Sequence, residues 1–135
     1  MYPIKTILDS GIRKAPDMGA LAAVRANAAA VMLWNYHDDD QTRLTGPVNL
    51  EIANIPAKTV TVTRYLIDDT HSNSYTVWKD MGSPQHPTAG QIAQLEEAGQ
   101  LMTEGRPKKM TVHAGGIRLG SDLKGQAVEL IKINW

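Results

Sequence analysis

The stretch RYLIDDTHSNSYTVWKDMGSPQHPTAGQIAQLEEAGQL, residues 64–101, decides the fold of this chain. It starts in an alternating, strand-like pattern, passes through a carboxylate-rich turn and then changes period. Tyr75, Trp78 and Met81 recur every three residues, which is typical of one face of a short helix. The stretch therefore predicts that the chain leaves a sheet, forms helical structure and returns.

Helix signals frame this excursion, which we expect over about residues 70–104. Ser72 or Asn73 can cap the start of the first helix. Thr88 and Gln91 have the spacing of a capping box and predict the start of a second helix. The apolar face of that second helix is expected to consist of Ile92, Leu95, Ala98 and Met102.

Strand patterns lie on both sides of the excursion. Ala26-Asn27 suits a tight turn between the first two strands, and a short turn at Pro56 predicts that the third and fourth strands pair as a hairpin. The last strand has apolar residues in two phases, which indicates a bulge or burial on both faces. The expected strands are Leu21–Arg25, Ala29–Tyr36, Val48–Ile52, Val60–Leu66, Met110–His113, Ile117–Leu119 and a final strand that ends at Trp135.

This pattern predicts a mainly β fold, an antiparallel β-sandwich with a two-helix insertion between its middle strands. We expect one domain over residues 1–135, with an irregular lead over residues 1–19. A chain of 135 residues is too short for a (β/α)8 barrel, which needs about 250 residues.

Composition excludes some classes of partner. Lys plus Arg equals Asp plus Glu at 14 each, so no excess of basic charge favours nucleic acid or an anionic membrane. No apolar run approaches the roughly 20 residues of a membrane span, and we expect a soluble product. The chain has no cysteine, so its compartment stays open, with a cytoplasmic location favoured over a periplasmic or secreted one.

Several polar clusters invite catalytic or metal-binding interpretations. His37 and the three aspartates after it have metal-ligand chemistry, but consecutive side chains on a strand point to opposite faces, which favours a solvated turn. The residue types of a Ser-His-Asp triad are supplied by Asp68, Asp69, His71, Ser72 and Ser74, but capping of the following helix is favoured. We expect no metal or cofactor site. All five glutamates are expected on the surface: Glu51, Glu96, Glu97, Glu104 and Glu129.

The aromatic side chains could stack on sugars or fill the core. Trp34 lies in a strand that is apolar on both faces, so we expect it in the core. Trp78 is expected to pack its helix against the sheet or against another domain.

The same residues carry a resemblance to family 39 of the glycoside hydrolases, which contains bacterial β-xylosidases and α-L-iduronidases. In that family, an RY-(L/R)-(I/L)-D segment precedes W-x-x-(M/L)-G-x-P and then P-T-x-x-Q. The xylosidase branch is more similar, because it commonly has HSNxY where this chain has residues 71–75, and WNYHDD at residues 34–39 also looks like that branch. The matching residues are Arg64, Tyr65, Ile67, Asp68, Trp78, Met81, Gly82, Pro84, Pro87, Thr88 and Gln91.

The resemblance implies the C-terminal, non-catalytic β-sandwich of an enzyme that hydrolyses terminal β-xylosides with retention. The family takes its two catalytic glutamates from a (β/α)8 barrel and has an Asn-Glu-Pro type motif, which this chain lacks, so no catalytic residue is expected here and the chain alone should be inactive. The sandwich is expected to support the absent barrel. In the family it is built partly from residues that precede the barrel, so an unpaired strand edge is expected here.

The predicted contact residues are His71, Asn73, Tyr75 and Trp78, at the interface between domains or at the wall of the active site. The exposed edge or a helical face could also form a homo-oligomer. The alternative function is a free-standing carbohydrate-binding or protein-interaction β-sandwich module.

Overall fold

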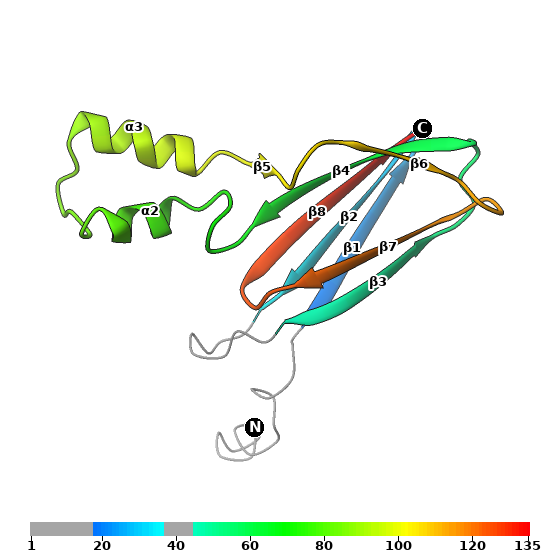
Figure 1. Cartoon of the computed structure of the whole chain (residues 1–135), viewed down its shortest axis with the longest axis horizontal. Coiled ribbons are helices and arrows are strands. Elements are labelled where there is room, and N and C mark those ends of the chain that lie inside the picture. The colour runs from blue at the N-terminus through cyan, green and yellow to red at the C-terminus, as the bar shows by residue number, and fades with distance from the viewer. Residues whose placement is uncertain (1–17, 37–44) are drawn as a thin grey trace, which may run out of the picture.

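The computed structural model describes residues 18–36 and 45–135. Two antiparallel sheets face each other in Figure 1, which confirms the mainly β fold. The long sheet has the order β1-β2-β8-β4-β5, with β6 also paired to β4, and the short sheet consists of β3 and β7. The strands are β1 (Met18–Arg25), β2 (Ala28–Asn35), β3 (Gly46–Ile52), β4 (Thr59–Ile67), β5 (Met102–Thr103), β6 (Lys108–Thr111), β7 (Ile117–Leu123) and β8 (Ala127–Asn134).

The core lies between the two sheets. Alternate side chains of the long sheet point inward to meet those of β7, as expected for a sandwich in which each strand has one buried face. The most buried members are Ile131 and Ile133 of β8, Val60 of β4 and Leu123 of β7. Ile55, in the connection between β3 and β4, completes this core. We call the inward side of the long sheet its core face and the opposite side its outer face.

The predicted first hairpin is confirmed. β1 pairs with β2 through the turn at Ala26-Asn27, with Arg25 opposite Ala28. The strand starts at Met18, so the last two residues of the predicted irregular lead belong to β1. The first 17 residues of that lead and the predicted turn at His37 lie outside the described residues.

The predicted hairpin of the third and fourth strands is wrong. β3 pairs with β7, whereas β4 pairs with β8, β5 and β6. The chain crosses from the short sheet to the long sheet between them, where Asn54 has a φ of 58° and the amide of Ile55 donates to the carbonyl of Gly115. Alternation predicted β3 and β4 as strands but carried no information about which strands pair with them.

The two-helix insertion is confirmed between β4 and β5. Helices α2 (Ser74–Asp80) and α3 (Ala89–Ala98) extend beyond the end of the sandwich as a separate arm (Figure 1). The capping box of Thr88 and Gln91 is present. The second helix ends at Ala98, so the predicted helical position of Met102 is wrong, because that residue pairs with Leu66 as part of β5.

The last strand contains no bulge. β8 pairs in unbroken register with both β2 and β4. The apolar pattern shifts along β8 because a charged residue, Glu129, takes a position on the core face, on the same side as Ile131. On the outer face, Val128 and Leu130 are apolar and half-buried. β2 also has apolar residues on the outer face, and Met32 is exposed there. The expected burial of β2 on both faces is therefore wrong.

Candidate functional site

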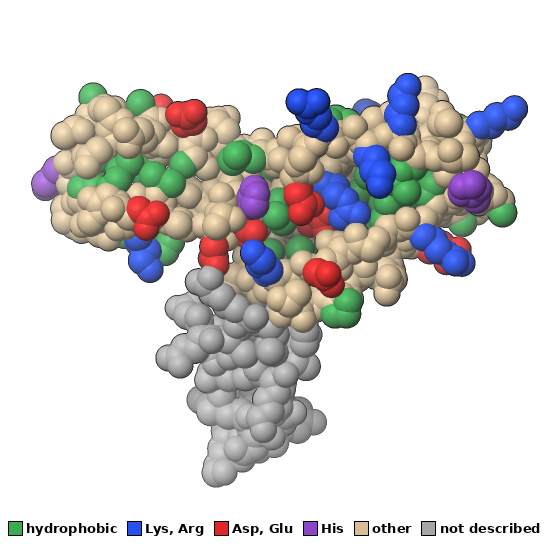
Figure 2. Space-filling view, in the orientation of Figure 1, with side chains coloured by type: hydrophobic (Ala, Val, Ile, Leu, Met, Phe, Trp, Pro, Cys, Tyr) green, Lys and Arg blue, Asp and Glu red, His purple; other side chains and the backbone are tan. Residues whose placement is uncertain are grey.

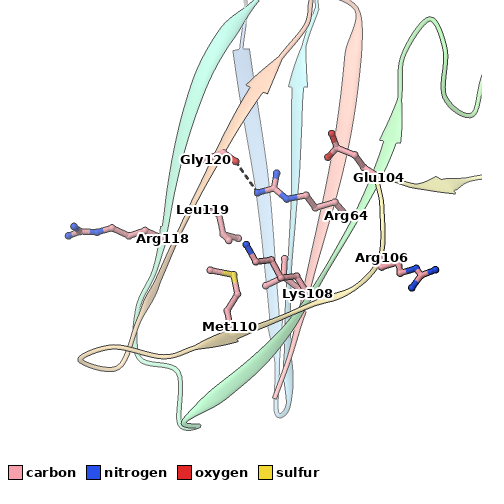
Figure 3. Close-up of a pocket in the computed structure, with 9 residues that line it drawn as sticks. Arg64, Glu104, Arg106, Lys108, Met110, Arg118, Leu119 and Gly120 are labelled. Carbon is pink, nitrogen blue, oxygen red and sulfur yellow. Dashed lines mark hydrogen bonds between the residues drawn. The ribbon is translucent and has the colours of Figure 1, made fainter.

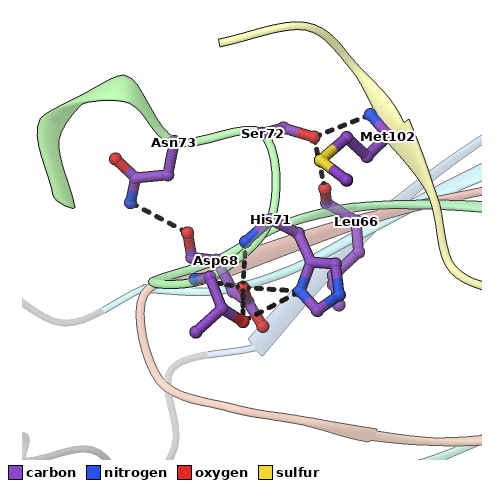
Figure 4. Close-up of polar contacts among 7 residues, drawn as sticks. Leu66, Asp68, His71, Ser72, Asn73 and Met102 are labelled. Carbon is purple, nitrogen blue, oxygen red and sulfur yellow. Dashed lines mark hydrogen bonds and ion pairs between the residues drawn. The ribbon is translucent and has the colours of Figure 1, made fainter. Parts of the chain in front are cut away.

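The base of the arm is organised by one buried carboxylate. Oδ1 of Asp68 accepts hydrogen bonds from the amide and hydroxyl of Thr70, at 2.7 and 3.0 Å, and from the amide and Nδ1 of His71, at 2.8 and 2.9 Å. Asp68 is only 7% exposed. The chain therefore wraps around this carboxylate as it leaves β4, as Figure 4 shows.

These contacts decide the ionisation of Asp68. Burial by itself raises the pKa of the carboxyl, but the hydrogen bonds from the Thr70 amide, the His71 side chain, the Thr70 hydroxyl and the His71 amide outweigh burial and lower the pKa from 3.8 to about 2. Asp68 is consequently a carboxylate at neutral pH. It serves as a fixed acceptor and not as a proton donor.

Ser72 ties the two chain segments that enter and leave the arm. Its Oγ donates to the carbonyl of Leu66 and accepts from the amide of Met102, both at 2.8 Å (Figure 4). Ser72 has a φ of 53°, a left-handed conformation that few non-glycine residues adopt. The hydroxyl is thus fully occupied by backbone groups.

Asn73 is the N-cap of α2. Its Oδ1 accepts from the amides of Tyr75 and Thr76, at 3.0 and 3.3 Å, and its Nδ2 donates to the carbonyl of Asp68 at 2.8 Å. The side chain therefore satisfies free amides at the helix start and fastens the helix to the end of β4. This settles the choice between Ser72 and Asn73 as the cap.

Tyr75 and Trp78 form the aromatic part of α2. Their rings stack with centroids 5.7 Å apart, and Nζ of Lys79 lies 5.4 Å from the centre of the Tyr75 ring. The indole Nε1 of Trp78 donates to the carbonyl of Pro84 at 3.1 Å. Tyr75 is 62% exposed, and no residue of α2 or α3 is buried. The arm thus presents apolar surface that the sandwich leaves uncovered.

The geometry does not assemble a nucleophilic triad. His71 contacts Asp68, but the hydroxyl of Ser72 is directed to backbone groups. Activation of a serine requires a hydrogen bond from its hydroxyl to the base. Within the described parts of the chain, no group of three or more His, Cys, Asp or Glu side chains is placed to hold a metal ion. The cluster of His37 falls outside those parts.

An ion pair inside the sandwich was missed by sequence reasoning. Glu129 is 1% exposed, and its carboxylate accepts from Arg64 Nη1 at 2.5 Å and from Ser121 Oγ at 2.6 Å. Nη2 of Arg64 donates to the carbonyl of Gly120 at 2.9 Å. The predicted surface position of Glu129 is therefore wrong, whereas the other four glutamates are exposed as predicted. The alternation of β8 could have predicted this burial, because it puts Glu129 on the same face of the strand as Ile131.

The outer face of the long sheet carries an apolar patch. Residues directly opposite each other on paired strands share a face. One row across the sheet is Leu21, Met32, Leu130 and Tyr65, and the next row is Gly19, Trp34, Val128 and Ile67. Leu21, Met32 and Ile67 are exposed, and the other members apart from glycine are half-buried. We call the seven side chains of these two rows, without Gly19, the outer patch.

Trp34 belongs to the outer patch and not to the core. A Cβ at Gly19 would lie 2.4 Å from the indole, which shows that the ring rests on the glycine backbone of β1. Trp34 is half-buried and outside the core cluster, so the prediction of a core position is wrong. The outer patch ends at Lys132, whose Nζ lies 5.9 Å from the centre of the Tyr65 ring.

Known proteins resemble this chain in both sequence and fold. The model of the family described as Glycosyl hydrolases family 39 matches residues 11–114. A β-xylosidase of Geobacillus stearothermophilus is 31% identical over 105 residues, which cover 77% of this chain and 20% of that protein. The chain thus spans about a fifth of this curated relative.

Solved structures show the same fold. A family 39 enzyme of Xanthomonas axonopodis pv. citri matches with a TM-score of 0.74 at 19% identity over 85% of this chain and 25% of its own. A monomeric β-xylosidase of Caulobacter crescentus CB15 matches with a TM-score of 0.73 at 16% identity over 85% of this chain and 26% of its own. With the family model covering most of its length, the chain belongs to family 39 of the glycosyl hydrolases.

Proposed function

We propose that this chain is the non-catalytic C-terminal β-sandwich of a β-xylosidase-like glycoside hydrolase, and that it supports a catalytic barrel present elsewhere in a larger protein. The parent enzyme would hydrolyse terminal β-xylosides with retention. The short coverage of the relatives supports a part of a longer enzyme. Retaining hydrolysis needs two carboxylates about 5 to 5.5 Å apart across the scissile bond. Glu129 cannot supply one, because it is engaged with Arg64 and Ser121.

The outer patch is the observation that carries this proposal. Seven apolar side chains on adjacent rows of one sheet face form a continuous surface, and surfaces of this kind normally bind another protein. Ile67 belongs to the patch and directly precedes Asp68, so the patch reaches the base of the arm. A domain that packs on the outer face would therefore also meet the arm.

The arm supplies the second part of the proposed contact. His71 and Asn73 fix the base of the arm, while Tyr75 and Trp78 present its aromatic surface. We propose that these four residues lie at the interface with the barrel, where they would position the arm beside the active site without taking part in the chemistry. Aromatic residues with one polar atom are well suited to such interfaces.

A sugar-binding module is the less favoured function. Such a module stacks sugars on aligned, exposed aromatic rings. The most exposed aromatics of the described chain, Tyr36 and Tyr75, lie on different elements, after β2 and on α2. The outer patch is mostly aliphatic, which fits a protein partner better than a sugar.

Reconstitution tests the proposal. The chain and the barrel encoded with it are produced as two polypeptides, mixed and assayed with a chromogenic xyloside. We expect no hydrolysis by the chain alone, and binding to the barrel that raises its thermal stability. Met32→Glu, on the outer patch, should weaken this binding, while Glu51→Lys, on the short sheet, should not.

Two results would overturn the proposal. One is hydrolysis by the isolated chain that a single Glu or Asp substitution abolishes. The other is a barrel with full stability and activity that does not bind the chain. Retention of the chain on insoluble xylan, lost on Tyr75→Ala, would instead support the sugar-binding alternative.

A further inference from the structure

The described part of the chain has two buried carboxylates, and their charges are compensated in different ways. Glu129 is paired with Arg64, a permanent cation that also reaches across to the carbonyl of Gly120 (Figure 3). Among the ion pairs of the described residues, the partner of Asp68 is the imidazole of His71, which is charged only when both of its nitrogens carry a proton. What Asp68 does at the base of the arm therefore depends on where the imidazole proton lies.

The contacts of His71 decide the position of that proton. Nδ1 lies 2.9 Å from Oδ1 of Asp68 and 3.0 Å from Oγ1 of Thr70. A carboxylate can only accept hydrogen bonds, so a lone pair on Nδ1 would face a negatively charged oxygen. The hydroxyl of Thr70 donates to the same Oδ1 and keeps its own lone pairs for an incoming donor. Nδ1 therefore carries the proton, and in the neutral ring the lone pair is on Nε2.

The second ring nitrogen of His71 is turned away from the carboxylate. Figure 4 shows Nδ1 toward Asp68 and the other nitrogen on the far side of the ring. The side chain of His71 is 36% exposed, whereas that of Asp68 is 6% exposed. Within the described residues, the hydrogen bonds of the ring all involve Nδ1. Because a carboxylate bonded to one nitrogen raises the basicity of the other, Nε2 is a strong and accessible acceptor.

This acceptor lies between the two surfaces that the proposed function assigns to the barrel. His71 comes four residues after Ile67 of the outer patch and four residues before Tyr75 of the arm, and both of these side chains are exposed. Figure 2 shows histidine and acidic side chains at the surface where the arm joins the sandwich. A domain that covers both surfaces also covers Nε2, and a buried acceptor without a donor is costly. The covering domain is therefore expected to supply a donor at this point.

On the basis of the function proposed above, we propose that Nε2 of His71 accepts a hydrogen bond from an N–H or O–H side chain of the catalytic barrel. Asp68 is a positioning residue, because it holds the ring in place and keeps the proton on Nδ1. The amide of His71 donates to the same Oδ1, so one carboxylate fixes both the backbone and the ring. Apolar contact has no preferred direction, whereas a hydrogen bond does, so this contact defines how the barrel sits on the arm.

The tautomer of His71 can be measured on the isolated chain. Two-bond correlation of ring protons with ring nitrogens by NMR distinguishes a protonated nitrogen from an unprotonated one, and the spectrum is recorded at about pH 8.5, where an ordinary imidazole is neutral. We expect a protonated Nδ1 and an unprotonated Nε2 for His71. The exposed His86 and His113 serve as controls and should show both tautomers. A proton on Nε2 of His71 at this pH overturns the proposal, whatever the chain binds.

Two substitutions separate the acceptor from the structural contact with Asp68. His71→Asn keeps an amide N–H in place of Nδ1–H and removes the acceptor at Nε2. It should retain the thermal stability of the isolated chain and bind the barrel at least about tenfold more weakly than the wild type. His71→Gln puts an amide oxygen near the position of Nε2 and loses the donor to Asp68. It should lower the melting temperature of the chain but bind the barrel more tightly than His71→Asn does.

Calorimetric titration of the chain with the barrel encoded with it measures these affinities. His113→Asn, in the turn between β6 and β7, should match the wild type in both stability and binding. Wild-type affinity of His71→Asn overturns this proposal and leaves the proposed function intact. Affinities of the two His71 variants that follow their melting temperatures also overturn it, because they show that His71 only clamps the arm. A barrel that does not bind the wild-type chain overturns the proposed function as well.

Discussion

A carboxylate inside a β-sandwich is stable only when other groups replace its lost water. Glu129 meets this condition with Arg64 and Ser121. The pair also joins layers, because Arg64 and Glu129 belong to the long sheet while Ser121 and Gly120 belong to β7. The alternation of β4 and β8 contained this information, since both charged residues are in phase with core residues. General exposure of glutamate was the wrong rule to apply at a position between Ala127 and Ile131 on the buried face of β8.

Removal of Glu129 should therefore destabilise the sandwich strongly. Glu129→Ala leaves Arg64 without its counter-ion and leaves a void, so we expect a loss of about 3 kcal/mol in the free energy of unfolding. The matched control is Glu51→Ala, which breaks an exposed ion pair with Arg118 and should cost less than about 0.5 kcal/mol. Chemical denaturation of both variants measures the difference. Equal losses would contradict the structural role of the buried pair.

The hydrogen bonds around Asp68 predict a dependence of stability on pH. The pKa of Asp68 is lowered to about 2 in the folded chain, and an unfolded aspartate titrates near its ordinary value of about 3.9. The charged form is therefore favoured by folding, so its contribution is complete above about pH 4 and is lost as the pH falls toward about 2. The contribution amounts to about 2 kcal/mol.

Asp68→Asn should remove this contribution. Its free energy of unfolding should fall below that of the wild type at pH 6, and the two values should converge as the pH approaches 2. Denaturant titrations at several pH values measure the effect. Asp122→Asn, which removes an exposed carboxylate, is the control and should follow the wild-type profile. A constant gap between Asp68→Asn and the wild type at every pH would show that the carboxylate charge is unimportant.

At the scale of elements, local signals predicted more than pairing did. The first hairpin, the two helices and the capping box were predictable, because turn and cap chemistry acts within a few residues. The partner of β3 was not, since β3 and β7 are separated by more than 60 residues and both have only the ordinary alternation. Apolar residues on two faces of β2 and β8 indicated burial on both sides, and the structure shows one of those sides as the outer patch.

Packing between β1 and β2 on that outer side can be tested at Gly19. A Cβ there would lie 2.4 Å from the indole of Trp34, so Gly19→Ala must displace the ring and should cost about 1 to 3 kcal/mol. Gly120→Ala is the matched control, because no atom lies within 4 Å of its Cβ. It should be neutral or slightly stabilising.

A double-mutant cycle separates this contact from other effects of the added methyl group. In a Trp34→Ala background, Gly19→Ala should lose most of its cost, because the ring that it displaces is gone. Thermal unfolding measures all four chains. An undiminished cost of Gly19→Ala without the indole would contradict the proposed contact. Truncation of a fully buried aromatic side chain to alanine lowers the free energy of unfolding by about 3 to 5 kcal/mol. Trp34→Ala alone should lower it by less, since Trp34 is half-buried.

The described part of the chain presents apolar side chains on two separate surfaces. The outer patch lies on one sheet face, and the arm adds Tyr75 and Ile92, which are 62% and 46% exposed. The family relation was predictable from the motifs of residues 64–101. The outer patch was not, because only the register across four strands brings its members together.

The isolated chain should accordingly associate as its concentration rises. Sedimentation velocity over a hundredfold range of concentration should show a growing fraction of dimers or larger species. Leu21→Glu weakens association if the outer patch is the contact, and Trp78→Ala weakens it if the arm is the contact. A chain that stays monomeric over the whole range would show that neither surface is sufficient for self-association.

The way in which the arm is attached makes it a replaceable module. Leu66 and Met102 are neighbours in the ladder of β4 and β5, and Ser72 bridges the same two residues through its hydroxyl. Topologically, the whole arm is the loop of a β-hairpin whose ends are already clamped. Evolution or a protein engineer can therefore lengthen, shorten or exchange residues 74–100 without altering strand register in the sandwich, and so vary what the arm contacts independently of the scaffold that holds it.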